Sequence, residues 1–257
     1  MKNPAYCSGL LPVICVVFFL LLAGCSGGGE PNAQQIVDAA IRAHGGKKYD
    51  HSIVSFRFRD RQYRALRDGG AFVYSRTFTD STGQHVHDVL RNSGFSRTIN
   101  DAEVTLPEDR KAAYSASVNS VIYFALLPYF LNDDAVQKAY AGEATIKGEP
   151  YYKVRVTFAQ QGGGEDHEDT YMYWFHQQQH TMDYLAYTFR EDNGDQGSRF
   201  RVAVNPRNVG GIRFQDYINY TSKTQIPLEQ YDSAYEAGKL EKVSDINLEE
   251  LAVQEVK

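Results

Sequence analysis

From Ser52 onward the chain adopts a hydrophobic period of two, and this limits the fold more than any other feature of the sequence. Val54, Phe56 and Phe58 alternate with polar residues, so they are expected on one face of a strand. The side chains expected on the opposite face are Arg57, Arg59 and Arg61. The pattern predicts a strand with one buried face.

Short segments of this kind recur along most of the chain, separated by turn residues such as Asp68-Gly69-Gly70 and Asp80-Ser81-Thr82-Gly83. Roughly a dozen candidate strands at this spacing predict a large antiparallel meander or open barrel. No alternation of strands with helices is present, so a parallel sheet is not expected. The further candidate strands are Ala71–Thr79, Gln84–Asn92, Phe95–Asn100, Ala135–Tyr140, Ala144–Lys147, Tyr151–Phe158, Asp169–His176, Met182–Phe189, Ser198–Val204 and Gly211–Thr221.

Two segments have helical features. Asn32 is a suitable N-cap for a helix that runs to His44, with apolar residues at helical spacing and Gly45-Gly46 after it. Pro107 and the acids after it suit the first turn of a second helix, which leads into the most hydrophobic part of the body, Asn119 to Leu131. Pro128 is expected to end or kink that helix. The charged tail from Glu236 onward is expected to hold a short strand or helix.

The N-terminus has the layout of a secretory signal. Leu10 to Ala23 are almost continuously apolar, and the run is shorter than the roughly 18 to 20 residues that span a bilayer. Leu22-Ala23-Gly24-Cys25 resembles the site at which lipoprotein signal peptidase cuts. We therefore expect residues 1–24 to be a lipoprotein signal peptide and Cys25 to be acylated, which would anchor the protein stably in a membrane.

The rest of the chain is expected to be a flexible tether, residues 25–32, followed by one domain, residues 33–257. Of the 3 cysteines, Cys7 and Cys15 lie in the predicted signal and Cys25 is expected to carry lipid, so the mature domain would have neither thiol nor disulfide. The net charge of −5 argues against nucleic acid as a partner.

One cluster of chemically active residues stands out, just after Gly162-Gly163-Gly164. A solvated hairpin tip is the favoured interpretation, because glycines precede the cluster. A hard cation such as calcium is the alternative, although the spacing is not that of a calcium loop. The weak candidate metal ligands are Glu165, Asp166, Glu168 and Asp169, and His167 lies among them.

Other signs of catalysis or metal binding are weak. His85 and His87 share a strand face beside Asp88, but zinc needs three or four ligands, so a polar outer face is favoured. The sequence lacks the nucleophile elbow, the phosphate-binding loop, the zinc-protease motif and the dinucleotide fingerprint. We expect no catalytic residue, no cofactor and no enzymatic activity; a hydrolase or ion-dependent activity at the cluster of residues 165–169 is the least favoured alternative.

The layout of a signal, one helix ending in Ala43-His44-Gly45-Gly46, a meander, the apolar segment Asn119 to Leu131 and a second meander resembles a known group of proteins. It is similar to the outer-membrane lipoprotein-sorting proteins. Three stretches, Ala43-His44-Gly45-Gly46, Asn119 to Leu131 and Gly162-Gly163-Gly164-Glu165-Asp166, resemble more closely a family of uncharacterised envelope lipoproteins from Gram-negative bacteria.

The resemblance implies a β-rich α+β fold, in which a strongly curved antiparallel sheet forms an incomplete barrel with an N-terminal helix and a helical insertion. In one interpretation, the concave side would hold acyl chains and the insertion would cover them as a lid. In the equally favoured alternative, the insertion fills the interior of the barrel and forms part of an ordinary hydrophobic core. The residues expected to form the lid are Tyr123, Phe124, Leu127, Tyr129 and Phe130. Those expected to line the hollow are Phe56, Phe58, Tyr171, Tyr173 and Tyr187.

Two functions follow from this interpretation. The first is a lipid-anchored envelope protein that binds lipid or lipoprotein acyl chains in a hydrophobic hollow, without catalysis. The second is a structural or interaction lipoprotein with a filled core that binds another envelope protein. The resemblance and the lack of an acidic run after Cys25 favour the periplasmic face of the outer membrane.

Overall fold

The computed structural model describes Met1 and residues 31–159, 169–190 and 194–256. Its first sheet has seven antiparallel strands in the order β14-β1-β2-β3-β4-β5-β6. The C-terminal strand therefore pairs with the first strand of the body. The bounds are β1 His51–Phe58, β2 Arg61–Asp68, β3 Ala71–Thr79, β4 His85–Arg91, β5 Gly94–Ile99, β6 Ala102–Glu103 and β14 Glu249–Glu255.

The second sheet also has seven antiparallel strands, in the order β13-β12-β11-β10-β9-β8-β7. Each strand of this sheet pairs with the next strand along the chain, and a helical segment lies between β12 and β13. The bounds are β7 Val136–Ile146, β8 Glu149–Phe158, β9 Tyr171–His176, β10 Met182–Arg190, β11 Gln196–Val209, β12 Ile212–Ser222 and β13 Leu240–Ile246.

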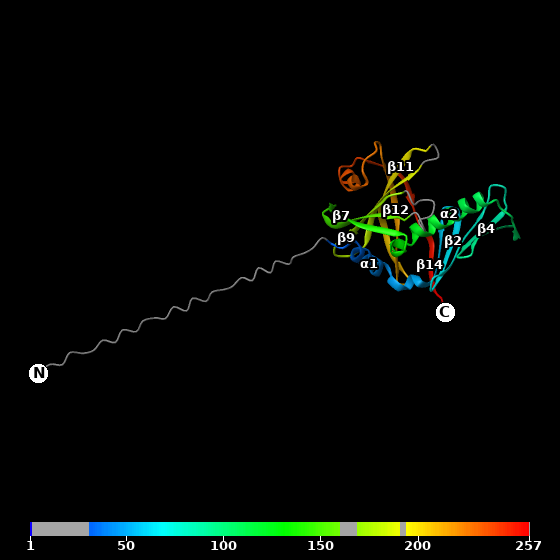
Figure 1. The fold of residues 1–257 in the computed structure, drawn as a ribbon, viewed down its shortest axis with the longest axis horizontal. Helices are drawn as coiled ribbons and strands as arrows, with labels where there is room; N and C mark the ends of the chain where they lie inside the picture. Colours follow the sequence, from blue (N-terminus) through cyan, green and yellow to red (C-terminus); the bar gives the residue numbers. More distant parts are fainter. Residues whose placement is uncertain (2–30, 160–168, 191–193, 257) are drawn as a thin grey trace.

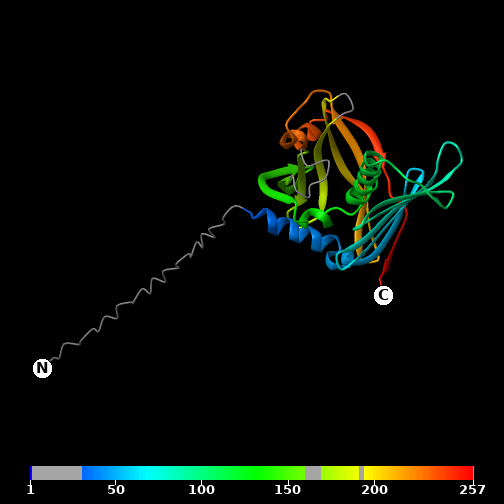
Figure 2. The same cartoon turned by 45° about the vertical axis from the view of Figure 1, so that its right-hand side comes forward.

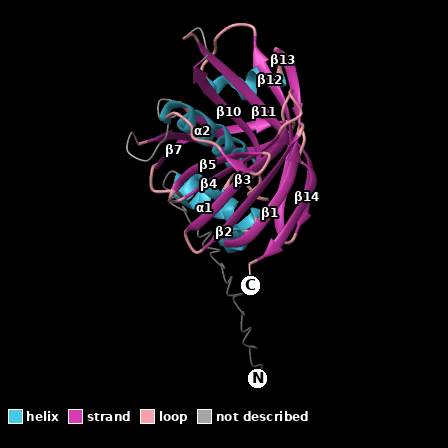
Figure 3. Ribbon diagram, turned by 90° about the vertical axis from the view of Figure 1, so that its right-hand side faces the viewer, coloured by secondary structure: helices cyan, strands magenta, loops and turns pink. Residues whose placement is uncertain are grey.

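The two sheets meet where β13 passes into β14. Between these strands the backbone of Leu248 bonds to the β11–β12 hairpin: its N–H donates to Asp216 Oδ1 at 2.9 Å, and its carbonyl accepts from Arg207 at 2.6 Å. The sheets curve together around the helices but do not close into a barrel (Figures 1 and 3). The predicted fold, an incomplete antiparallel barrel with an N-terminal helix and a helical insertion, is confirmed.

Helix α1, Ala33–His44, has the ends that the sequence predicts. The Asn32 side chain caps it by accepting hydrogen bonds from the backbone of Gln34 and Gln35, and Gly45 follows with φ +139°. The helix buries one apolar side, including Val37 and Ala40, against the second sheet and the segment after α2.

Helix α2, Glu108–Ala125, lies on the concave side between the two sheets (Figure 2). Glu108 and Asp109 occupy its first turn, where carboxylates interact favourably with the helix dipole. Val118 and Ile122 are fully buried against the first sheet. The helix ends at Ala125 and the short 3₁₀ helix η2, Tyr129–Asn132, follows Pro128, so the expectation that Pro128 ends or kinks the helix is confirmed.

The second sheet is covered on both faces. Its concave face packs on α1 and on Leu127 and Leu131. Its convex face packs on η3, Leu228–Gln230, and α3, Tyr231–Glu236, around the fully buried Trp174. This arrangement explains why all six residues of β9 are buried.

Two local expectations are wrong. Arg59 and Arg61 do not continue the first strand, because Arg59 adopts φ +54° in a turn and Arg61 begins β2. Ala135–Tyr140 and Ala144–Lys147 are not separate strands but parts of β7, joined across an irregularity between Tyr140 and Glu143. In the tail a strand is one of the two expected possibilities, and the structure has two strands, β13 and β14, preceded by helix α3.

Candidate functional site

Two cavities flank the C-terminal half of α2. The larger cavity has a volume of about 390 Å³ and the smaller about 250 Å³. Ser120 and Phe124 of α2 and Tyr171 of β9 line both, so these side chains separate the two spaces. The interior of the half-barrel is therefore only partly filled by the helix.

The larger cavity lies between α2, the concave face of the second sheet and the beginning of the β1–β2 turn. Most of its wall is apolar or aromatic, and a polar patch comes from β11, β12 and β13. The apolar and aromatic residues are Phe58, Val121, Phe124, Ala125, Tyr171, Tyr187, Phe189, Tyr217, Ile246 and Leu248; the polar residues are Arg59, Ser120, Asp169, Arg201, Gln215, Asn219 and Ser244.

The aromatic rings of this wall contact one another. Tyr171 and Tyr187 stack with ring centroids 5.7 Å apart, and Phe124 lies 5.3 Å from Tyr187 and 6.3 Å from Tyr171. These separations fall within the range in which aromatic pairs attract each other. The rings form an ordered apolar surface on one side of the larger cavity.

Arg201 of β11 points to the concave side, since Phe200 and Val202 belong to the convex core. Its guanidinium carbon lies 4.1 Å from the ring centroid of Phe124, and one terminal nitrogen donates to the Tyr187 hydroxyl at 2.9 Å. Its Nε is buried and has no hydrogen-bond partner. A buried donor without a partner costs about 1–3 kcal/mol, more where the group is charged.

Two amide side chains on β12 also present unpaired atoms. Gln215 is 5% exposed and donates through Nε2 to the Met182 carbonyl at 2.6 Å and to the Tyr217 hydroxyl at 2.9 Å, which leaves Oε1 without a partner. Asn219 is 8% exposed, donates weakly to Ser244 at 3.5 Å and leaves Oδ1 unpaired. Burial raises the pKa of Tyr217 to about 12, so its hydroxyl stays protonated at neutral pH.

The smaller cavity contains an arginine that donates to two tyrosine hydroxyls. Arg67 donates through Nε to the Tyr129 hydroxyl at 3.1 Å and through a terminal nitrogen to the Tyr74 hydroxyl at 2.6 Å. Burial raises the pKa of Asp133, which lines the same cavity, and the Arg67 charge partly opposes that rise. Unlike Arg201, Arg67 therefore has a partner for its Nε, whereas the hydroxyl of Tyr123 in this lining has none.

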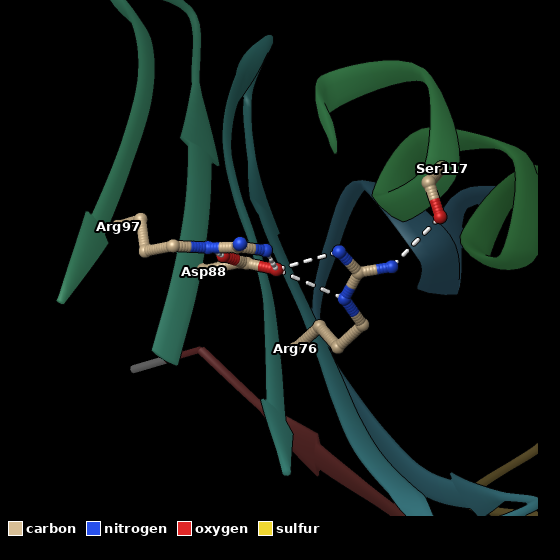
Figure 4. A network of polar contacts seen from close by, with 4 residues as sticks. All are labelled: Arg76, Asp88, Arg97 and Ser117. Carbon is tan, nitrogen blue, oxygen red and sulfur yellow. Dashed lines mark hydrogen bonds and ion pairs between the residues drawn. The ribbon is translucent and has the colours of Figure 1, made fainter. Parts of the chain in front are cut away.

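A buried ionic network attaches α2 to the first sheet (Figure 4). Asp88 is fully buried and accepts hydrogen bonds from both Arg76 and Arg97, at 2.6 to 3.0 Å. Arg76 also donates to Ser117 of α2 at 2.7 Å, and the Arg97 guanidinium carbon lies 3.7 Å from the ring centroid of Tyr114 on the same helix. The middle of α2 is thereby held against the first sheet.

The residues predicted to form the lid and the hollow divide into three groups. Tyr123 and Phe130 line the smaller cavity, Phe58 and Tyr187 the larger one, and Phe124 and Tyr171 both. Tyr129 stacks on Tyr49 at 4.8 Å and donates to Asp50 at 2.5 Å, away from the larger cavity. The residues packed in the core without lining either cavity are Phe56, Leu127 and Tyr173.

The predicted lipidation site Cys25 and the weak metal candidates Glu165, Asp166 and Glu168 lie outside the described residues. Asp169 lies on the wall of the larger cavity. Among residues 31–159, 169–190 and 194–256, no group of three or more His, Cys, Asp or Glu side chains is placed to hold a metal ion. His85 is exposed, whereas its neighbour Asp88 is buried on the other face of β4.

The sequence alone does not reveal the polar groups of the ionic network and of the larger cavity. Arg76, Asp88 and Arg97 look like ordinary charged strand residues, and only the cross-strand register Arg76–Asp88–Arg97 brings them together. Arg201 and Asn219 are likewise opposite each other in the β11–β12 pair. Arg201 alternates with the apolar Phe200 and Val202, so the period of two assigns it to a solvent-facing side, and only the second buried face of this sheet makes it part of a cavity wall.

In structural terms, this is a β-rich protein built as an incomplete antiparallel barrel, with a helix inside the hollow and a cavity on either side of that helix. The chain belongs to a family of unknown function, DUF6503, whose model matches residues 13–248. The expectation of a family whose function is not characterised is confirmed. In the part of the chain that the structure describes, no helix is long and apolar enough to span a membrane.

A comparison with solved structures finds chains that share little sequence with this one. A DUF1329 family protein from Desulfovibrio piger is 11% identical, with a TM-score of 0.47, 86% of this chain and 92% of that chain covered. A domain described as an outer membrane lipoprotein-sorting protein from Vibrio parahaemolyticus is 7% identical, with a TM-score of 0.43 and 87% and 94% covered. The lipoprotein LppX from Mycobacterium tuberculosis is 13% identical, with a TM-score of 0.27 and 61% and 88% covered. A comparison with curated proteins finds no match.

Proposed function

We propose that this protein is a lipid-anchored protein of the cell envelope that binds an acyl chain of a lipid or lipoprotein in the larger cavity and catalyses no reaction. The observation that carries the proposal is the cavity of about 390 Å³ between α2 and the aromatic wall of the second sheet. Its volume lies at the lower end of the range of about 300–1,000 Å³ found for small-molecule sites.

The volume of the cavity limits the size of the ligand. At about 30 Å³ for a water-sized group, a cavity of this size holds about a dozen methylene groups. Burying a dozen methylenes contributes about 10 kcal/mol at 0.8 kcal/mol each, against an association cost of about 4–15 kcal/mol. The cavity therefore suits one acyl chain of medium length, and not the two or three chains of an acylated cysteine.

The binding test compares protein purified from the membrane fraction with protein stripped of lipid by organic extraction. We expect native mass spectrometry of the first preparation to show a bound lipid at one copy per chain. The stripped protein should take up a fluorescent fatty acid at one site. Repeatedly empty preparations that also fail to bind the fatty acid would refute the proposal.

The anchor is part of the proposal, and Cys25 is the residue that carries it. Its support is the sequence Leu22-Ala23-Gly24-Cys25 after an apolar run, with a glycine-rich tether before α1. We place the protein at the periplasmic face of the outer membrane. Cys25→Ser should abolish labelling by radioactive palmitate and leave the precursor uncut. The control Cys15→Ser should change neither the labelling nor the cleavage. Normal processing of Cys25→Ser would contradict the anchor.

The second candidate is an interaction lipoprotein that binds another envelope protein and holds no ligand. It is favoured by the dense packing of Phe56, Leu127 and Tyr173, each at most 4% exposed, in the same interior. This function requires that the larger cavity stay empty or filled by water. The lipid-binding test above separates the two candidates.

A further inference from the structure

The charged groups around the larger cavity are unevenly distributed. Arg59 and Arg201 contribute two guanidinium groups to its wall, and Asp169 is the one carboxylate among the described lining residues. Asp169 already takes part in an interaction. Arg201 forms no ion pair with a carboxylate in the described part of the chain, and its buried Nε–H has no acceptor. An acceptor supplied by a ligand would complete this site.

The Arg201 side chain is held in place without the ligand. Its guanidinium contacts the rings of Phe124, at 4.1 Å from the centroid, and Tyr187, at 5.1 Å, and it donates to the Tyr187 hydroxyl. A guanidinium fixed by aromatic rings loses little freedom when it binds an anion. The same rings form the apolar wall along which an acyl chain would lie, so the cation lies directly beside the place proposed for the chain.

A polar acceptor faces the same space from the neighbouring strand. The Gln215 amide is oriented by its bond to the Met182 carbonyl, which only the NH₂ group can make, so Oε1 is the unpaired atom. With the side chain 95% buried, this oxygen lacks water as a ready partner. A hydroxyl on the ligand would donate to it, whereas an anionic oxygen would be repelled.

From this arrangement we infer that the ligand of the larger cavity is a single-chain amphiphile with an anionic head, which accepts a hydrogen bond from Arg201, while its chain contacts Phe124, Tyr171 and Tyr187. The head is a carboxylate or a phosphate, and a hydroxyl elsewhere on the ligand would donate to Gln215. The inference rests on the proposed function and adds the chemistry of the headgroup. The smaller cavity does not offer the same site, because Arg67 already donates to Tyr74 and Tyr129.

The test uses ligands that share one chain and differ in the head: tetradecanoate, tetradecyl phosphate and the uncharged methyl tetradecanoate. Their affinities for the lipid-stripped full chain are measured by displacement of a fluorescent fatty acid. We expect the wild-type protein to bind at least one of the anions about tenfold or more tightly than the ester, as charge-assisted hydrogen bonds imply. The anion that binds more tightly identifies the head as carboxylate or phosphate.

Three variants isolate the role of Arg201. Arg201→Gln should remove the preference for the anion. The affinity for the ester should change by no more than about threefold, which is the effect expected from losing the contacts of the guanidinium with the rings of Phe124 and Tyr187. Arg201→Lys should retain a preference, because it keeps the charge. Arg199→Gln is the matched control, since this arginine lies on the same strand outside the lining of the cavity and should leave the preference unchanged.

The possible results separate the headgroup from the lipid-binding function. Equal binding of anion and ester by the wild-type protein would overturn the inference and leave the proposed function intact. A preference that persists in Arg201→Gln would also overturn it, because another group would then hold the head. No binding of any of the three ligands would overturn both. Retained ester binding by Arg201→Gln shows that the variant is folded.

Discussion

At the scale of single residues, Asp88 is a buried carboxylate that pairs with two arginines. It is fully buried between Arg76 and Arg97, both nearly buried themselves. Its carboxylate compensates two guanidinium groups at once, so removing the charge leaves two buried cations without an anion. Removing one partner of a buried ion pair costs about 3–5 kcal/mol.

Asp88→Asn should therefore destabilise the protein by about 3–5 kcal/mol, measured as a lower midpoint of urea unfolding. The control is Asp68→Asn, which breaks the exposed pair with His51 and should cost no more than about 1 kcal/mol. A loss for Asp88→Asn as small as that of the control would mean that the two arginines are solvated, contrary to the structure.

His44 gives the protein a defined pH dependence. Burial, and then the charge of Arg213, lower its pKa from 6.5 to about 3, and its Nε2 accepts a hydrogen bond from the Met182 backbone. The unfolded chain binds a proton below pH 6.5 and the folded protein does not. The stabilisation is thus complete above pH 6.5 and is lost progressively as the pH falls towards 3.

The free energy of unfolding should fall by about 2 kcal/mol between pH 7 and pH 5 through this residue alone, since each pKa unit is worth about 1.4 kcal/mol. Urea unfolding at the two pH values measures the loss. It should shrink in His44→Gln and persist in His51→Gln, whose side chain is 59% exposed. An unchanged loss in His44→Gln would assign the pH dependence to other groups.

At the scale of helices and strands, features encoded locally could be predicted and those decided by distant contacts could not. Helix α1 has both its capping residue and its terminal glycine in the sequence, and its predicted ends are confirmed. The end of α2 before Pro128 is likewise confirmed, although the apolar run continues into Leu127 and Phe130, which are buried beyond the helix. The continuous β7 was missed because an irregularity interrupts its period of two.

The inward side of α2 is where the candidate site can be tested at this scale. Ser120 lines both cavities and is a small residue, so Ser120→Phe would place a ring between them. We expect fatty-acid binding to weaken by at least about tenfold. The ring would occupy space needed by the acyl chain, and a loss of about 1.4 kcal/mol of chain burial corresponds to a tenfold loss of affinity. Ala113→Phe, at an exposed position of the same helix, should leave binding unchanged. Equal binding by both variants would place the ligand elsewhere.

At the scale of the whole molecule, the pairing of β14 with β1 adds the C-terminal strand to one edge of the first sheet. Ser52 lies opposite Glu255, so this contact joins residues far apart in the domain. The three apolar residues of β14, Leu251, Ala252 and Val253, lie among charged and polar ones and give little sign of such a partner. The curved half-barrel could be predicted from the number of strands and the resemblance, whereas the order that places β14 beside β1 needed the structure.

The join between the two sheets predicts a specific cost of substitution at Gly210, at the tip of the β11–β12 hairpin. A Cβ there would lie 2.7 Å from Val253 Cβ of β14, and the backbone has φ +59°. Gly69 has a similar φ of +54°, but its nearest atom would be 4.0 Å away. Alanine at either position carries the left-handed strain of about 1–2 kcal/mol, and only Gly210→Ala adds an overpacking cost of about 1–3 kcal/mol. Urea unfolding should therefore show Gly210→Ala to be the less stable variant; equal stabilities would mean that the hairpin tip is not packed against β14.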